Sequence, residues 1–212
     1  MAKHQFPIST TGAVDVIREG PVRLRIRETT PTHGILELAV DYEKAQPPDK
    51  AYAADYCRVQ KVDYDYVLIF GKLIPGKAKL RNKVEMSFSH KAFAYQLWHN
   101  SRGLHKSLAE ELQVGRRLPL DVEDTDTVQS FRANNVFSAW LGEDGLIDFY
   151  YIPPSDIHYA RAGKRSRISL DPILRIVMSS HILLSCLEQV DDLVRSDSSF
   201  ASTIEKDMNS LL

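Results

Sequence analysis

Residues 66–76 read Tyr66-Val67-Leu68-Ile69-Phe70-Gly71-Lys72-Leu73-Ile74-Pro75-Gly76. The first five are continuous and apolar, as is typical of a strand that is covered on both faces. Ile74-Pro75-Gly76 ends this strand, because proline lacks the N–H that a strand ladder needs and glycine favours a turn. Residues 56–62 predict a strand before it, and residues 63–65 a turn between the two.

A helix is predicted to follow this pair of strands. The basic residues 77–83 lead into a short strand over 83–88, and Ser87 or Ser89 can cap the helix that starts there. Apolar residues then recur at spacings of four and seven, which places them on one helix face. These residues are Phe93, Leu97, Leu104, Leu108 and Leu112. Residues 56–113 therefore predict one unit of three strands and a helix.

The same order of elements recurs in residues 128–194. Strands are predicted over 134–141 and 146–151, and Ile152-Pro153 ends the second as Ile74-Pro75 ends its counterpart. The repetition predicts a tandem pseudo-repeat, in which the middle strands match at one constant offset in the sequence. The matched pairs are Val67 with Leu146, Leu68 with Ile147 and Phe70 with Phe149.

The second unit also predicts a third strand and a helix. Ile168 and Leu170 match Val84 and Met86, two alternate residues of the first unit's third strand. Asp171 is a suitable helix cap, and Pro172 is suited to the first helical position. The expected apolar face of this helix consists of Ile173, Ile176, Leu183, Leu187 and Val190.

Residues 128–194 resemble a small bacterial domain family of unknown function. The resemblance rests on Arg132-Ala133-Asn134-Asn135-Val136 and on Arg167-Ile168-Ser169-Leu170-Asp171-Pro172. Members of that family have a strand pair, the motif Arg-x-x-Leu-Ser-Pro and one amphipathic helix; here an aspartate replaces the motif's serine. Residues 56–113 resemble the family more distantly, with Ser87-Phe88-Ser89 where the motif has Ser-Pro. The resemblance implies a fold and no activity.

Residues 1–55 predict an N-terminal hairpin and a linker. Apolar residues alternate with three arginines over 22–27, and the alternation resumes after a turn. Residues 45–54, which begin with alanine and contain two prolines, predict the linker. The arginines face acids of the opposite strand, so cross-strand ion pairs are favoured over phosphate contacts. The expected antiparallel register puts Leu24 opposite Leu38, Ile26 opposite Leu36 and Arg25 opposite Glu37.

Residues 195–212 form a C-terminal tail. They are rich in serine at first, and apolar residues then recur at helical spacing. This pattern predicts a short helix that docks on the body of the protein or on a partner. The apolar residues are Phe200, Ile204, Met208 and Leu211.

The composition limits the possible functions. The 212 residues include 27 Lys and Arg against 28 Asp and Glu, so the formal net charge is -1. This balance excludes a globally basic protein that coats nucleic acid. Two cysteines, Cys57 and Cys186, cannot build the disulfide framework of a small secreted protein. We expect a cytoplasmic protein with reduced thiols, since neither a signal peptide nor a membrane-spanning run is recognisable.

No catalytic or metal-binding motif is recognisable. The seven histidines lack the spacing of a zinc site, and glycine-rich phosphate loops and nucleophile elbows are missing. We therefore predict a protein that is not an enzyme and uses no cofactor or metal. An active site assembled from scattered residues would leave no such signal.

Two basic loops are the candidate binding site. Residues 72–83 and 158–167 gather basic residues with no acid between them. Such loops can contact a partner or nucleic acid, although a solvated loop balanced by the acidic linker 121–126 is the more common arrangement. The candidate contacts are Lys77, Lys79, Arg81, Lys83, Arg161, Lys164, Arg165 and Arg167.

Taken together, these patterns predict an α+β fold with short antiparallel strands and two main amphipathic helices. The two units should form one compact domain, because each is too small to bury a core alone. For function we expect a non-enzymatic protein-interaction or adaptor module that binds a protein partner or forms a homo-oligomer. The alternative is a nucleic-acid-binding protein that uses both basic loops. No membrane partner is expected.

Overall fold

The computed structural model describes residues 13–17, 22–30, 33–40, 50–90, 92–113, 122, 128–155 and 172–200. Its strands are β1 (Ala13–Ile17), β2 (Val22–Thr30), β3 (His33–Val40), β4 (Ala51–Ala53), β5 (Tyr56–Val62), β6 (Asp65–Leu73), β7 (Leu80–Ser89), β8 (Val128–Arg132), β9 (Asn135–Leu141), β10 (Asp144–Tyr150) and β11 (Leu174–Ser179). Its helices are the π-helical η1 (Ala92–His99), α1 (Asn100–Leu112), α3 (Ser180–Ser196) and the 3-10 helix η2 (Ser198–Phe200).

The N-terminal strands form an antiparallel sheet in the order β1-β2-β3. Strand β1, which the sequence did not predict, pairs with the second edge of β2. The predicted register of β2 and β3 is confirmed, because a slip by one residue would turn the apolar row to the other face. In it, Leu24 lies opposite Leu38, Ile26 opposite Leu36 and Arg25 opposite Glu37.

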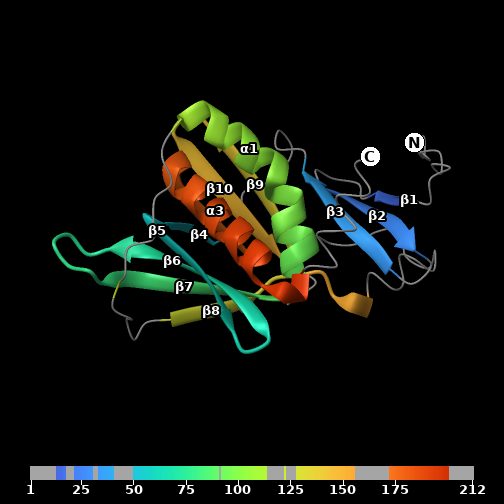
Figure 1. The fold of residues 1–212 in the computed structure, drawn as a ribbon, viewed down its shortest axis with the longest axis horizontal. Helices are drawn as coiled ribbons and strands as arrows, with labels where there is room; N and C mark the ends of the chain where they lie inside the picture. Colours follow the sequence, from blue (N-terminus) through green and yellow to red (C-terminus); the bar gives the residue numbers. More distant parts are fainter. Residues whose placement is uncertain are drawn as a thin grey trace.

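Two four-stranded sheets make up the body of the protein. Their strand orders are β5-β6-β7-β8 and β4-β11-β10-β9. In each sheet three strands form an antiparallel meander, and the fourth joins in parallel. Together with the helices, these mixed sheets give the predicted α+β fold (Figure 1).

In each sheet, the parallel strand comes from a different half of the chain than the three antiparallel strands do. Strand β4 leads directly into β5 but pairs with β11, and β8 leads directly into β9 but pairs with β7. Ala54 N–H donates to Val177 O over 2.8 Å, and Ala133 N–H donates to Ser87 O over 3.0 Å. The prediction of a linker over 45–54 was therefore wrong at its end, where β4 is too short to show strand alternation.

The second long helix begins later than predicted. Residues Leu174–Ser179 form β11, and α3 begins at Ser180. Ser179 caps it, because its Oγ accepts a hydrogen bond from Ile182 N–H over 3.4 Å. Pro172 therefore starts no helix, and Asp171 lies outside the described residues. Strand β11 lies between β10 and β4, and this pairing on both edges outweighs the helical spacing of its apolar residues.

This shift changes how the third strands of the two units match. Met86 in β7 and Ile176 in β11 each lie opposite the matched apolar position of the middle strand. Met86 therefore corresponds to Ile176 rather than to Leu170. Ile168 and Leu170, on which the predicted match rested, lie outside the described residues.

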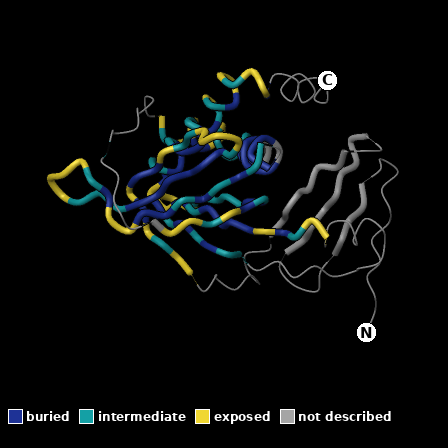
Figure 2. The backbone as a smooth tube through the Cα atoms, turned by 90° about the horizontal axis from the view of Figure 1, so that it is seen from below, coloured by how far each residue is buried: buried dark blue, intermediate teal, exposed yellow. Residues whose placement is uncertain are grey.

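Both units contribute to one core. Apolar side chains from the two sheets and from η1, α1 and α3 form a single buried cluster. Helices α1 and α3 lie side by side and run antiparallel over β9 and β10 (Figure 1). Buried segments run through the strands and helices of this body in Figure 2. The predicted face of the first helix is confirmed, with Phe93, Leu97 and Leu108 fully buried and Leu104 and Leu112 packed against the core.

Candidate functional site

The β6–β7 hairpin forms a projecting basic arm, which we define as residues 71–82. It extends from the body at the left of Figure 1, and its tip is exposed in Figure 2. Ile74 N–H donates to Lys79 O over 2.9 Å, and Lys77 N–H donates to Ile74 O over 3.0 Å. Gly76 has a φ of 74°, a left-handed conformation that favours glycine. The turn at the tip is therefore closed by its own backbone.

The base of the basic arm is packed against the body. Leu80 is buried in a small apolar cluster with Val67 and Ile69 of β6. Asp55 Oδ1 accepts a hydrogen bond from Leu73 N–H over 2.6 Å. The alternate residues of β6, Leu68 among them, belong to the main core, so β6 is covered on both faces as predicted. This packing holds the arm in a defined direction.

The basic arm carries positive charge that the described part of the chain does not compensate. Lys77 and Arg81 are exposed, while Lys72 and Lys79 are half-buried. Lys72 lies directly opposite Arg81 in the strand register, and like charges at such positions destabilise a strand pair. Residues 66–84 contain no acid. Among the residues that the structure describes, none of the four cations forms an ion pair.

Lys83, which the sequence placed among the contact residues, lies beyond the basic arm. Its side chain is 5% exposed, and its Nζ lies 3.0 Å from Glu85 Oε1. The cause is the early start of β7 at Leu80, which places Lys83 inside the sheet. We therefore remove Lys83 from the candidate contacts.

The second basic loop lies outside the described residues. This holds for each of its predicted contacts, so the binding role of this loop stays a prediction. The residues concerned are Arg161, Lys164, Arg165 and Arg167.

A polar cluster that the sequence did not predict ties the end of α3 to the body; we call it the C-terminal clamp. Asp197 Oδ2 accepts hydrogen bonds from Tyr66 Oη and Lys61 Nζ, each over 2.7 Å. Asp197 Oδ1 accepts one from Ser199 Oγ over 2.6 Å, and Ser199 Oγ lies 3.1 Å from His90 Nε2. The members come from distant parts of the chain, so no local pattern could reveal them.

The C-terminal clamp contains the residue types of a hydrolase triad but not its arrangement. In a triad the histidine accepts the serine proton. Here Ser199 donates to Asp197, so His90 can only donate to the serine oxygen. The Lys61 ammonium holds the pKa of the Asp197 carboxyl well below its usual range, which makes it a weak base. The clamp is therefore suited to anchoring the chain.

Phe200 completes this anchor. Its ring is fully buried and stacks on the His90 ring with 4.1 Å between centroids. It also packs on the Tyr66 ring, with 5.0 Å between centroids. The predicted docking of the tail on the body is thus confirmed for Phe200, while Ile204, Met208 and Leu211 lie outside the described residues.

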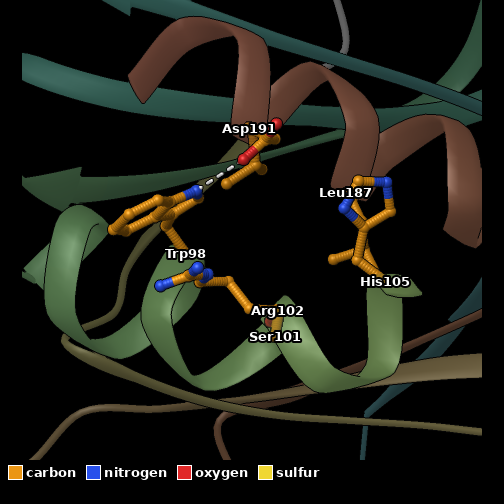
Figure 3. A pocket seen from close by; sticks show the side chains of 7 residues that line it. Trp98, Ser101, Arg102, His105, Leu187 and Asp191 are labelled. Atoms are coloured by element: carbon orange, nitrogen blue, oxygen red, sulfur yellow. Dashed lines mark hydrogen bonds between the residues drawn. The ribbon is translucent and has the colours of Figure 1, made fainter. Parts of the chain in front are cut away.

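A second polar cluster lines a shallow depression between α1 and α3 (Figure 3). Trp98 Nε1 and Arg195 Nε donate to the two oxygens of Asp191 over 2.9 and 2.6 Å. Burial alone would raise the pKa of Asp191, but these hydrogen bonds lower it. The depression measures about 10 Å³, which is room for one water molecule. With its carboxylate already paired, this cluster offers no space for a substrate.

Across the described residues, no helix is long and apolar enough to span a membrane. The same residues contain no group of three or more His, Cys, Asp or Glu placed to hold a metal ion.

No protein-family model, curated protein or solved structure matches this chain. The resemblance of residues 128–194 to a small domain family therefore stays a prediction. Its motif at 167–172 was expected to enter a helix, whereas the next element is strand β11.

Proposed function

We propose that this protein is a non-enzymatic binding module that holds the phosphate backbone of a nucleic acid with its basic arm. The observation that supports this most is the cross-strand pair of Lys72 and Arg81. Two cations directly opposite each other cost strand stability, and no acid of the arm relieves that cost. A polyanion that neutralises both would relieve it. The packed base of the arm limits the entropy lost on binding.

The composition of the basic arm favours nucleic acid over an acidic protein. Three of its four cations are lysines, and residues 71–82 contain no aromatic residue. Protein interfaces are depleted in lysine and draw their affinity from aromatic and arginine anchors. Lysine and arginine without such anchors are typical of phosphate contacts. A two-stranded ribbon also fits the major groove of a DNA duplex.

A pair of matched variants tests this proposal. Lys77→Gln/Arg81→Gln removes two charges from the basic arm, and Lys50→Gln/Lys106→Gln removes two exposed charges elsewhere. Fluorescence anisotropy with a short labelled DNA duplex at low salt measures the affinity of each. The arm variant should bind roughly 10- to 100-fold more weakly, and the control variant close to wild type. Equal weakening in both variants, or no binding by the wild type, would contradict the proposal.

The protein-interaction or adaptor module remains a second candidate. It is supported by Tyr64, which is 93% exposed at the β5–β6 turn, and by Leu141, which is 88% exposed at the β9–β10 turn. Exposed tyrosine is enriched among the residues that anchor protein interfaces. On this proposal the partner is another protein or a second copy of the chain. Sedimentation velocity should then show self-association that Tyr64→Ser/Leu141→Ser abolishes, whereas a strictly monomeric wild type would contradict a homo-oligomer.

We also propose that the two units are a tandem repeat. The support is a set of hydrogen bonds that recur in both units. The bonded residues of one unit are separated from those of the other by the same sequence offset as the middle strands. Asp55 N–H donates to Gly71 O and Asn134 N–H to Tyr150 O, and the side chains of Asp55 and Asn134 accept from Leu73 N–H and Ile152 N–H.

A cytoplasmic protein of bacterial type is a further part of the proposal. Both cysteines are free, as is usual in a reducing compartment. The bacterial origin rests on the resemblance of residues 128–194 alone. Locating the tagged protein by cell fractionation would test the compartment.

A further inference from the structure

The two cysteines of the chain meet in its core. Cys57 lies in β5 and Cys186 in α3, and they are 5% and 0% exposed. Both belong to the same buried cluster. The two side chains interact with each other in this cluster, although they come from opposite halves of the sequence. Such an approach is the first requirement for a bond between the two sulfurs.

A glutamine side chain holds the helix over the strand at the level of these cysteines. Gln189, the next turn of α3 after Cys186, accepts a hydrogen bond from Val59 N–H over 3.0 Å. Its Nε2 donates to Cys57 O over 3.2 Å. These two contacts fix the position of α3 along β5. The two cysteines are therefore held next to each other in the core.

We propose that Cys57 and Cys186 form a reversible disulfide when the protein meets hydrogen peroxide, and that this bond locks α3 to β5. One thiolate attacks a peroxide oxygen, which gives a sulfenic acid and hydroxide. The second thiolate attacks the sulfenic sulfur, forms the S–S bond and expels a second hydroxide. The two thiol protons convert both hydroxides to water. Two electrons pass from the sulfurs to the peroxide, and a dithiol reductant reverses the change.

The packing makes this reaction slow in the closed fold. Burial, with the neighbouring thiol as a smaller cause, raises the pKa of Cys57, so little thiolate is present at neutral pH. Oxidation therefore requires α3 to lift from β5, as in a local opening of the fold. Once formed, the bond closes a loop of about 130 residues, and it should raise the thermal midpoint by roughly 5–15 °C. The protein would thus be stapled after an oxidative challenge.

Intact mass measured without reductant tests the proposal directly. Wild-type protein treated with hydrogen peroxide should lose about 2 Da, the mass of two hydrogen atoms, without forming a dimer. Its thermal midpoint should rise and return after dithiothreitol. The loss of mass should be faster in urea below the unfolding transition. Single variants Cys57→Ala and Cys186→Ala should show neither the loss of mass nor the rise.

Several outcomes would overturn the proposal. These are a wild type that only gains oxygen, one that forms disulfide-linked dimers, and one whose thermal midpoint falls on oxidation. If the alanine variants do not fold, peptide mapping of the oxidised wild type still decides, since it either finds Cys57 joined to Cys186 or does not. The result is independent of DNA binding, because both cysteines are buried in the core and neither belongs to the basic arm.

Discussion

Replacing Arg175 with alanine should strongly destabilise the fold. Its Nε and Nη2 donate to the two oxygens of Asp148 over 2.7 and 2.8 Å, and the Asp148 side chain is only 2% exposed. The pair lies directly opposite in the register of β10 and β11. Arg175→Ala leaves a carboxylate that water can hardly reach. The expected cost is about 3–5 kcal/mol of the free energy of unfolding.

A second arginine in the same protein provides the control. Arg132 also binds both oxygens of an aspartate, Asp65, over 2.9 and 3.2 Å, but the two side chains are 52% and 35% exposed. Arg132→Ala should therefore cost about 0–1 kcal/mol. Urea unfolding followed by tryptophan fluorescence measures both. Asp148→Leu/Arg175→Leu should recover most of the loss, since it buries no charge. Equal costs for the two alanine variants would refute the reasoning.

Three further predictions concern stability. In Gly145→Ala the new Cβ would lie 2.8 Å from Leu183 Cδ2, so calorimetry should show a loss of about 1–3 kcal/mol in the free energy of unfolding. Gly103→Ala, whose new Cβ would have no atom within 4 Å, should raise this free energy by about 0.5–1 kcal/mol. Phe200→Ala should cost about 3–5 kcal/mol in urea unfolding, and a cost below about 1 kcal/mol would show that the anchor is dispensable. Because folding lowers the pKa of Asp197, its carboxylate stabilises the fold at pH values above 3.8, the pKa of this group in the unfolded chain. This contribution is lost as the pH falls through the lower pKa that Asp197 has in the folded protein. The thermal midpoint of Asp197→Asn should thus fall less than that of wild type between neutral pH and about pH 2.

The elements with strong local patterns could be predicted from the sequence. The register of Leu24 with Leu38 followed from simple alternation, and the buried strand β6 from its continuous apolar run. Strand β11 was missed because Pro172 and the spacing of Ile176 imitate a helix start. Its strand conformation depends on two neighbouring strands, of which β4 comes from the distant first half of the chain.

The candidate site, too, could be predicted from the sequence only where the local pattern is strong. Lys77, Lys79 and Arg81 were predicted as contacts from the run of cations that follows a proline-glycine turn. The structure places all three on the projecting arm. The burial of Lys83 depends on where β7 begins, which the basic run concealed. The C-terminal clamp joins side chains from opposite halves of the chain, so only the folded chain shows it.

The salt dependence of DNA binding is the decisive measurement for the basic arm. If its four cations contact phosphates, the logarithm of the association constant should fall against the logarithm of the salt concentration with a slope of about -3.6. In Lys77→Gln/Arg81→Gln the slope should be about -1.8, and in Lys50→Gln/Lys106→Gln it should equal that of wild type. The same slope in all three proteins would contradict phosphate binding by the arm.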